Sequence, residues 1–364
     1  MPIVLAGMAA TVFGVSDFMG GTAARRVPSA VVAMLAQLAG LLALGLILLV
    51  LPATVLPSAL GWGLLAGLAG GIGVPLLYRG LAVGPMNVVA PLTALTSAAV
   101  PVITGAVLGE RPSVQAWVGI ALALIAGVVV GMSLDSKGTG GADGTDGTDG
   151  TDGSDGSAGT DDTGGALGAD RGADRGADRG ADRDARRRAL RGVAIALFSG
   201  LCFGGFFVLL AQADPVAGLW PVATAKVAGS LVAGVALLGA LRSGGLAVGR
   251  LGGVGAGAGG VGVDPASGVG EFGIQAGGSN GGGVLLAGHG WRLAALGGVL
   301  DALANALYLL AAHRGQLAVV GSVVALYPAS TVLLARLMHG ERIGRVQRIG
   351  LALAVPALVL VSGG

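Results

Sequence analysis

Long apolar runs separated by polar breaks dominate this chain. The runs at 86–108 and 114–133 are joined by only Gly109-Glu110-Arg111-Pro112. Each has roughly 20 residues, which is long enough to cross a bilayer as a helix. Counted along the chain, the runs predict ten membrane-spanning helices, at residues 3–22, 29–51, 59–77, 86–108, 114–133, 189–211, 216–241, 291–312, 317–338 and 346–361.

The composition agrees with this pattern. Hydrophobic residues make up 53% of the chain and charged residues only 12%, whereas a soluble domain carries about twice that charge. The short alternating segments of a β-barrel are absent. The predicted fold class is therefore all-α, a polytopic membrane protein whose main partner is the lipid bilayer. The net charge of +2, with basic residues in the breaks rather than in one patch, argues against nucleic acid as a partner.

Two long polar stretches interrupt the runs. Residues 134–188 consist of Thr-Asp-Gly units, then Gly-Ala-Asp-Arg units and three arginines. They cannot bury enough apolar surface to fold and are predicted to be a disordered linker. A calcium-binding β-roll would need a large apolar residue in each repeat, and none is present. Residues 242–290 are Gly-rich and are predicted to be a loop, which leaves five spans in 1–133 and five in 189–362.

The two groups of five spans repeat one another. Moving forward by 231 positions places Gly109-Glu110-Arg111 on Gly340-Glu341-Arg342 without a gap. In the first spans, Phe13 and Phe18 fall on Phe198 and Phe203. Because five is odd, the second copy must enter the membrane from the opposite side. Such inverted repeats are typical of transporters, which place the substrate site near mid-membrane between the repeats.

These features resemble one known family. The opening Phe13-Gly14-Val15-Ser16-Asp17-Phe18, the Gly-Glu-Arg motif after spans four and nine, and the five-plus-five arrangement are similar to the ten-helix branch of the drug/metabolite transporter (DMT) superfamily, with two EamA-type domains. The resemblance implies a secondary transporter of the cell membrane, in a bacterium the inner membrane. Members commonly export (efflux) amino acids, metabolites or drugs, and two domains in one chain suggest a monomer or a homodimer.

Polar residues inside the predicted spans are the main candidates for a transport site. Ionisable groups are costly in a bilayer, so each is a functional candidate. We expect five polar side chains, three ionisable and two amide, to line a central cavity that holds the substrate or couples to protons: Asp17, Lys226, Asp301, Gln37 and Asn305. The sharpest hypothesis is a Lys226–Asp301 ion pair that the substrate or a proton breaks. The alternative is a purely structural pair between neighbouring helices.

Aromatic, small and proline residues extend this list. Tyr308 and Tyr327 lie deep enough in their spans to contact a substrate. Small residues spaced every four positions let helices approach closely, and a proline can bend a helix. Helix packing, or bending during gating, is therefore expected at Gly63, Gly67, Gly71, Pro75, Pro91, Pro101 and Pro328. The Gly-Glu-Arg motifs are expected to end a helix in a tight turn.

The sequence offers nothing that indicates an enzyme. It has no His-Glu-x-x-His and no Gly-x-Ser-x-Gly motif. The absence of a Gly-x4-Gly-Lys-Ser/Thr loop argues against direct use of ATP, so coupling to a proton gradient or to exchange is expected. The single cysteine, Cys202, excludes a cysteine metal site, and no cofactor is expected. The alternatives that remain are a non-transporting membrane scaffold or receptor, and a polytopic membrane enzyme.

The orientation of the chain stays open at this stage. Cytoplasmic loops carry an excess of Lys and Arg. The loops after spans one, three, seven and nine are richer in arginine than the loops on the other side, which hold little beyond Arg111 and Arg314. The count therefore favours both termini outside. The resemblance, in contrast, implies that both termini lie in the cytoplasm.

Overall fold

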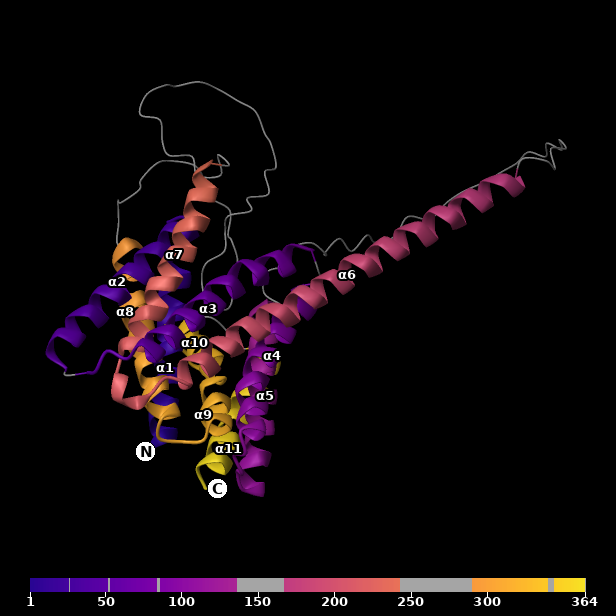
Figure 1. Ribbon diagram of the computed structural model, residues 1–364. Coiled ribbons are helices and arrows are strands. Elements are labelled where there is room, and N and C mark those ends of the chain that lie inside the picture. The colour runs from indigo at the N-terminus through magenta and orange to yellow at the C-terminus, as the bar shows by residue number, and fades with distance from the viewer. Residues whose placement is uncertain are drawn as a thin grey trace, which may run out of the picture.

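The computed structural model is a helical bundle from which one long helix projects (Figure 1). It describes residues 1–25, 27–51, 53–83, 86–135, 167–242, 290–339 and 344–363, and in these residues all regular structure is helical. The first half comprises α1 (Pro2–Ala24), α2 (Ser29–Val50), α3 (Pro57–Val83), α4 (Met86–Val107) and α5 (Val114–Asp135). The second half comprises α6 (Leu167–Ala211), the 3-10 turn η2 (Pro215–Ala217), α7 (Trp220–Arg242), α8 (Gly290–Ala312), α9 (Leu317–Val324), α10 (Tyr327–His339) and α11 (Arg345–Ser362).

Length and hydropathy make most of these helices suitable for crossing a membrane. Among the described residues, eight apolar segments of at least 18 residues satisfy both criteria, and α9 and α10 together form one of them. Two shorter apolar helical stretches, Pro91–Val107 in α4 and Val114–Val130 in α5, complete the series. The predicted fold class, an all-α polytopic membrane protein, is confirmed.

The contacts between helices come in pairs. Helix α1 packs along α8, as α3 packs along α6. Helix α2 contacts α8, as α3 contacts α7, and α4 contacts α6, as α1 contacts α10. Mapping the first five spans onto the second five exchanges the two contacts of each pair. The contacts α2–α7, α4–α9 and α5–α11 map onto themselves. A pseudo-two-fold relation between the halves generates this pattern, and the halves interlock rather than lying side by side.

Small residues allow the closest of these contacts. A methyl group added at Gly67 would overlap the backbone of Ala225, so the glycine stripe that includes Gly63 and Gly71 packs directly against α7. At Gly204 an added methyl group would lie 2.7 Å from the Ser97 carbonyl oxygen, which brings α6 against α4. Without side chains at these positions, the backbones themselves make the van der Waals contacts.

The turn between α4 and α5 follows the rules of a glycine C-cap. Gly109 has φ +87°, which a residue with a side chain adopts only with strain. Its N–H donates to Ala106 O (3.2 Å), and the Glu110 N–H donates to Gly105 O (3.0 Å). These two bonds satisfy carbonyls at the end of α4 in the Schellman arrangement. The second copy of the motif, at 340–342, lies outside the described residues.

The structure differs from the sequence prediction in two places. Residues 167–188, predicted as part of a disordered linker, are helical and extend α6 to 45 residues; alanine and arginine, which recur there, are strong helix formers. The ninth span has the predicted bounds, Leu317–Met338, but its helix is interrupted between α9 and α10. The remaining linker residues 136–166, and 243–289 of the predicted Gly-rich loop, lie outside the described residues.

Candidate functional site

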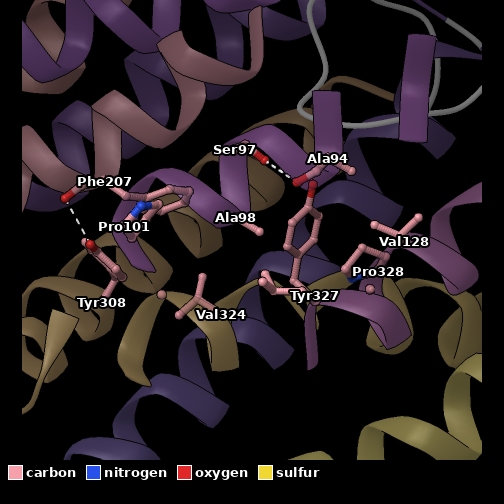
Figure 2. A pocket seen from close by; sticks show the side chains of 14 residues that line it. Ala94, Ser97, Ala98, Pro101, Val128, Phe207, Tyr308, Val324, Tyr327 and Pro328 are labelled. Atoms are coloured by element: carbon pink, nitrogen blue, oxygen red, sulfur yellow. Dashed lines mark hydrogen bonds between the residues drawn. The ribbon is translucent and has the colours of Figure 1, made fainter. Parts of the chain in front are cut away.

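A small cavity lies where α4 and α5 of the first half meet α9 and α10 of the second (Figure 2). Its volume is about 40 Å³, and since one water needs about 10–15 Å³ on this measure, it has room for a few water molecules but not for an organic solute. None of the side chains that line it is charged: Ala94, Ser97, Ala98, Pro101, Leu124, Gly127, Val128, Phe207, Tyr308, Gly321, Val324, Ala325, Tyr327 and Pro328.

The break between α9 and α10 forms one wall of the cavity. Pro328 has no N–H, so it cannot donate to the carbonyl of Val324, four residues earlier. The chain tightens instead: Leu326 N–H donates to Val323 O (3.1 Å), and Ala329 N–H donates to Leu326 O (2.9 Å). Helix α5 approaches this break closely, because a methyl group at Gly127 would lie 2.8 Å from the Ala325 carbonyl oxygen. Non-helical backbone at such depth is tolerated where protein or a cavity surrounds it.

Helix α4 forms the opposite wall. A methyl group at Gly321 of α9 would lie 2.6 Å from Pro101 Cβ, so α4 and α9 are in close contact at the cavity. Pro101 also leaves the Ser97 carbonyl without a helical donor. The Ser97 hydroxyl donates to the Ala94 carbonyl (2.9 Å), and the Tyr327 ring points across the cavity towards Ala94 (Figure 2). Among the predicted hinge prolines, Pro101 and Pro328 line the cavity, whereas Pro75 and Pro91 lie within α3 and α4 away from its lining.

An aromatic cluster joins helices of both halves beside the cavity. Phe13 of α1 packs edge-on against Phe207 of α6 (ring centroids 6.0 Å apart) and against Tyr327 of α10 (6.4 Å). Phe207 also contacts Tyr308 of α8 (4.7 Å), whose hydroxyl donates to the Phe207 carbonyl (2.9 Å; Figure 2). Tyr308 is completely buried. The tyrosines that the sequence singled out therefore lie at the contact between the halves, and both line the cavity.

A polar cluster lies on α8 before Tyr308, further from the cavity. The Lys226 ammonium on α7 forms an ion pair with Asp301 Oδ2 on α8, and these side chains are only 9% and 14% exposed. Asn305, which is 2% exposed, donates from Nδ2 to the Asp301 carbonyl (2.8 Å) and to Asp301 Oδ1 (3.2 Å). The other amide atom, Asn305 Oδ1, is buried and has no hydrogen-bond partner among the described residues.

The remaining predicted polar residues approach this cluster from α2 and α1. Gln37 lies against Gly229, less than one turn along α7 from Lys226, and its Oε1 is also buried without a partner among the described residues. Asp17 is half-buried on α1. Its neighbour Ser16 donates to the Gly297 carbonyl on α8 (2.9 Å).

The cavity and the polar cluster share one face of α8. Asp301, Asn305 and Tyr308 are spaced by four and three residues, so they point to the same side of the helix. The rise from Asp301 to Tyr308 is about 10 Å. Tyr308 and Tyr327 line the cavity, whereas the five polar residues predicted to line it do not in this conformation. Their roles in transport stay predictions.

Sequence reasoning missed the role of Glu110 in joining the two halves. Its carboxylate accepts hydrogen bonds from Leu317 N–H (2.5 Å, Oε1) and Ala318 N–H (2.9 Å, Oε2). These are the first two residues of α9, where backbone N–H groups lack helical partners and the helix dipole favours an anion. The glutamate was expected only to take part in a turn. Its exact recurrence at Glu341 was the one available sign of a further role.

Comparisons with known proteins relate the chain to one family and to a solved structure. The model of the EamA-like transporter family matches residues 1–132 and 278–363, which is more than half of the chain. A solved structure titled only "Crystal structure of protein" has a TM-score of 0.59 and 14% sequence identity, and the match covers 99% of this chain and 96% of that one. This similarity supports the fold alone. No curated protein matches the sequence significantly. The chain belongs to the EamA-like transporter family of membrane transporters, within the drug/metabolite transporter superfamily.

Proposed function

We propose that the protein is a secondary transporter that exports small organic solutes across the cell membrane by alternating access. The observation that carries this proposal is the small cavity between the halves, beside the interruption between α9 and α10. Transporters with inverted repeats bind substrate at such interfaces, often beside discontinuous helices. Family membership supports transport itself; the alternating access, the solute and the direction are proposed here.

The size of the cavity supports a conformational cycle. At about 40 Å³ it cannot hold a solute, so α4 and α9–α10 must separate before one binds. Helices α4 and α9–α10 would separate at their close contact and beside the aromatic cluster. Because α4 and α9–α10 correspond under the repeat, opening on one side has a counterpart on the other. Exchange between two such states is the alternating-access scheme.

The Lys226–Asp301 pair is the proposed coupling element. Breaking a buried ion pair by removing one partner costs about 3–5 kcal/mol, because an uncompensated charge remains. Opening between α7 and α8 therefore requires another ion to replace the lost partner. A substrate charge or a proton on Asp301 would serve, and this links helix movement to binding.

Electrophysiology on solid-supported membranes tests the function. Purified protein in liposomes is challenged with amino acids, polyamines and lipophilic cations, with and without a pH gradient. Radiolabelled counterflow on the same panel detects electroneutral exchange. We expect a solute-dependent signal that Lys226→Ala and Asp301→Ala abolish, while Arg111→Ala, at an exposed loop position, retains it. No current and no counterflow for any solute would refute transport, and a signal that survives both variants would make the ion pair structural. Comparing inverted vesicles with intact cells gives the direction.

A further inference from the structure

We infer that Asp301 recognises the cationic nitrogen of an amine substrate, and that Lys226 is a tethered ammonium which the substrate displaces. This inference rests on the proposed transport function and specifies its substrate class. Its starting point is that Asp301 already binds an ammonium group in an enclosed, largely desolvated setting. A free amine presents the same group to the same carboxylate.

Unused acceptors around the pair support this assignment. Asn305 Oδ1 and Gln37 Oε1 are both buried without a hydrogen-bond partner among the described residues. The orientation of the Asn305 amide is fixed, because its Nδ2 faces two acceptor oxygens of Asp301. Buried polar atoms without partners are costly and uncommon, and a missing ligand is one explanation for them. Here both unused atoms are acceptors, so the missing group is a donor.

A primary ammonium group fits this set of acceptors. It carries three N–H donors and no acceptor. With Asp301, the two amide oxygens Asn305 Oδ1 and Gln37 Oε1 provide three acceptors, contributed by α8 and α2. Lys226 approaches from α7, and its ammonium stays tethered to that helix by the lysine side chain. An untethered amine has no such restriction. A second ammonium group beside Lys226 would leave one buried positive charge uncompensated, so the amine and Lys226 compete for Asp301.

The neighbouring cavity indicates the rest of the solute. The α8 face leads from Asp301 past Asn305 to Tyr308, beyond which the cavity is lined by Phe207, Tyr327 and aliphatic side chains. Since no lining side chain is charged, an anionic solute would find no countercharge there. An amine with an apolar or aromatic body would place its nitrogen at Asp301 and its body between the halves once these separate.

If Lys226 competes with the amine for Asp301, removing Lys226 should tighten amine binding rather than weaken it. If Lys226 occupies Asp301 about nine-tenths of the time, removing it should tighten amine binding about tenfold. A structural ion pair predicts the reverse, because loss of Lys226 would damage the site. Asp301→Asn should weaken amine binding by about 30-fold or more, and Asn305→Leu should weaken it less. Lys226→Arg, which keeps a tethered cation, should stay close to the unchanged protein.

The experiment uses the full chain in nanodiscs. Propylamine, 2-phenylethylamine and tryptamine are each compared with the alcohol that replaces the amine by hydroxyl, and Kd is measured by isothermal titration calorimetry. We expect at least one amine to bind, its alcohol to bind far more weakly, and Lys226→Met to lower the Kd of that amine. The double variant Lys226→Met/Asp301→Asn removes both charges; it should fold without an unpaired ion and should not bind the amine.

Three results would overturn the inference: no amine binding in either the unchanged protein or Lys226→Met, alcohols that bind as tightly as amines, or weaker amine binding in Lys226→Met. Failure here is distinct from failure of the proposed function. A protein that moves neutral or anionic solutes in counterflow but binds no amine remains a transporter with a different substrate class.

Discussion

Replacing Glu110 by alanine removes the side chain that joins the α4–α5 turn to the start of α9. The carboxylate accepts hydrogen bonds from two N–H groups of the second half, at 2.5 and 2.9 Å. Hydrogen bonds to charged groups contribute about 1.5–3 kcal/mol each, while loss of an N-cap costs about 0.5–2 kcal/mol. One half-buried carboxylate makes both bonds, so they are not additive, and we expect Glu110→Ala to cost about 2–4 kcal/mol.

The graded variants separate the charge from the hydrogen bonds. Glutamine keeps one acceptor oxygen at the helix start but loses the charge, so Glu110→Gln should cost about 1–2 kcal/mol. Thermal unfolding of the purified protein in detergent should show a midpoint lowered by about 4–12 °C in Glu110→Ala, and by less in Glu110→Gln. Arg111→Ala is the matched control, since Arg111 is the adjacent residue of the same turn and is exposed.

Equal midpoints for Glu110→Ala and Arg111→Ala would refute the reasoning, because the carboxylate would then contribute nothing to holding α9. A Glu110→Gln variant as unstable as Glu110→Ala would show that charge alone matters. The transport assay adds a second readout. Since the far end of α9 lines the cavity, loosening its start should alter the transport rate as well as stability.

Three further predictions concern packing, pH and orientation. Gly298→Val should prevent α2 from reaching α8, because the added side chain overlaps the α2 backbone. We expect a loss of about 1–3 kcal/mol in thermal unfolding, against no loss in Gly45→Ala, where an added methyl group has open space. Burial lowers the pKa of His313 below its usual value, opposed by a hydrogen bond with the backbone of the α6–η2 turn and by a nearby aspartate. The unfolded chain therefore binds more protons than the folded one, so stability should fall as pH drops through about 6.5. His313→Gln should flatten this pH dependence of the unfolding midpoint. With Cys202 replaced by alanine, the arginine count predicts that Arg111→Cys reacts with an impermeant thiol reagent in intact cells and that Arg25→Cys reacts only after permeabilisation; the opposite labelling would place the termini in the cytoplasm.

The contact between the halves at Glu110 illustrates what local sequence cannot show. Gly109 and Glu110 predict a turn, because a glycine after an apolar run ends a helix through its positive φ. The partner of the glutamate, at the start of α9, lies 207 residues further along the chain. Nothing in the turn itself specifies that partner. Pro328 predicts a bend in the ninth span but not the interruption between α9 and α10, since it lies in an otherwise continuous apolar run and a proline can bend a membrane helix without ending it.

The sequence by itself determined the all-α membrane fold, the approximate spans and the repeated motifs, because runs of apolar residues and turn glycines act locally. It also marked Lys226 and Asp301, since charges are conspicuous in apolar runs, and the structure brings these two together. Only the tertiary structure decided that Tyr308 and Tyr327 line a cavity, while the polar cluster lies further along α8, outside the cavity lining. The physical reason is that the cavity and the ion pair arise from packing between halves that are distant in sequence, where the shapes of facing side chains, rather than local preference, set the geometry.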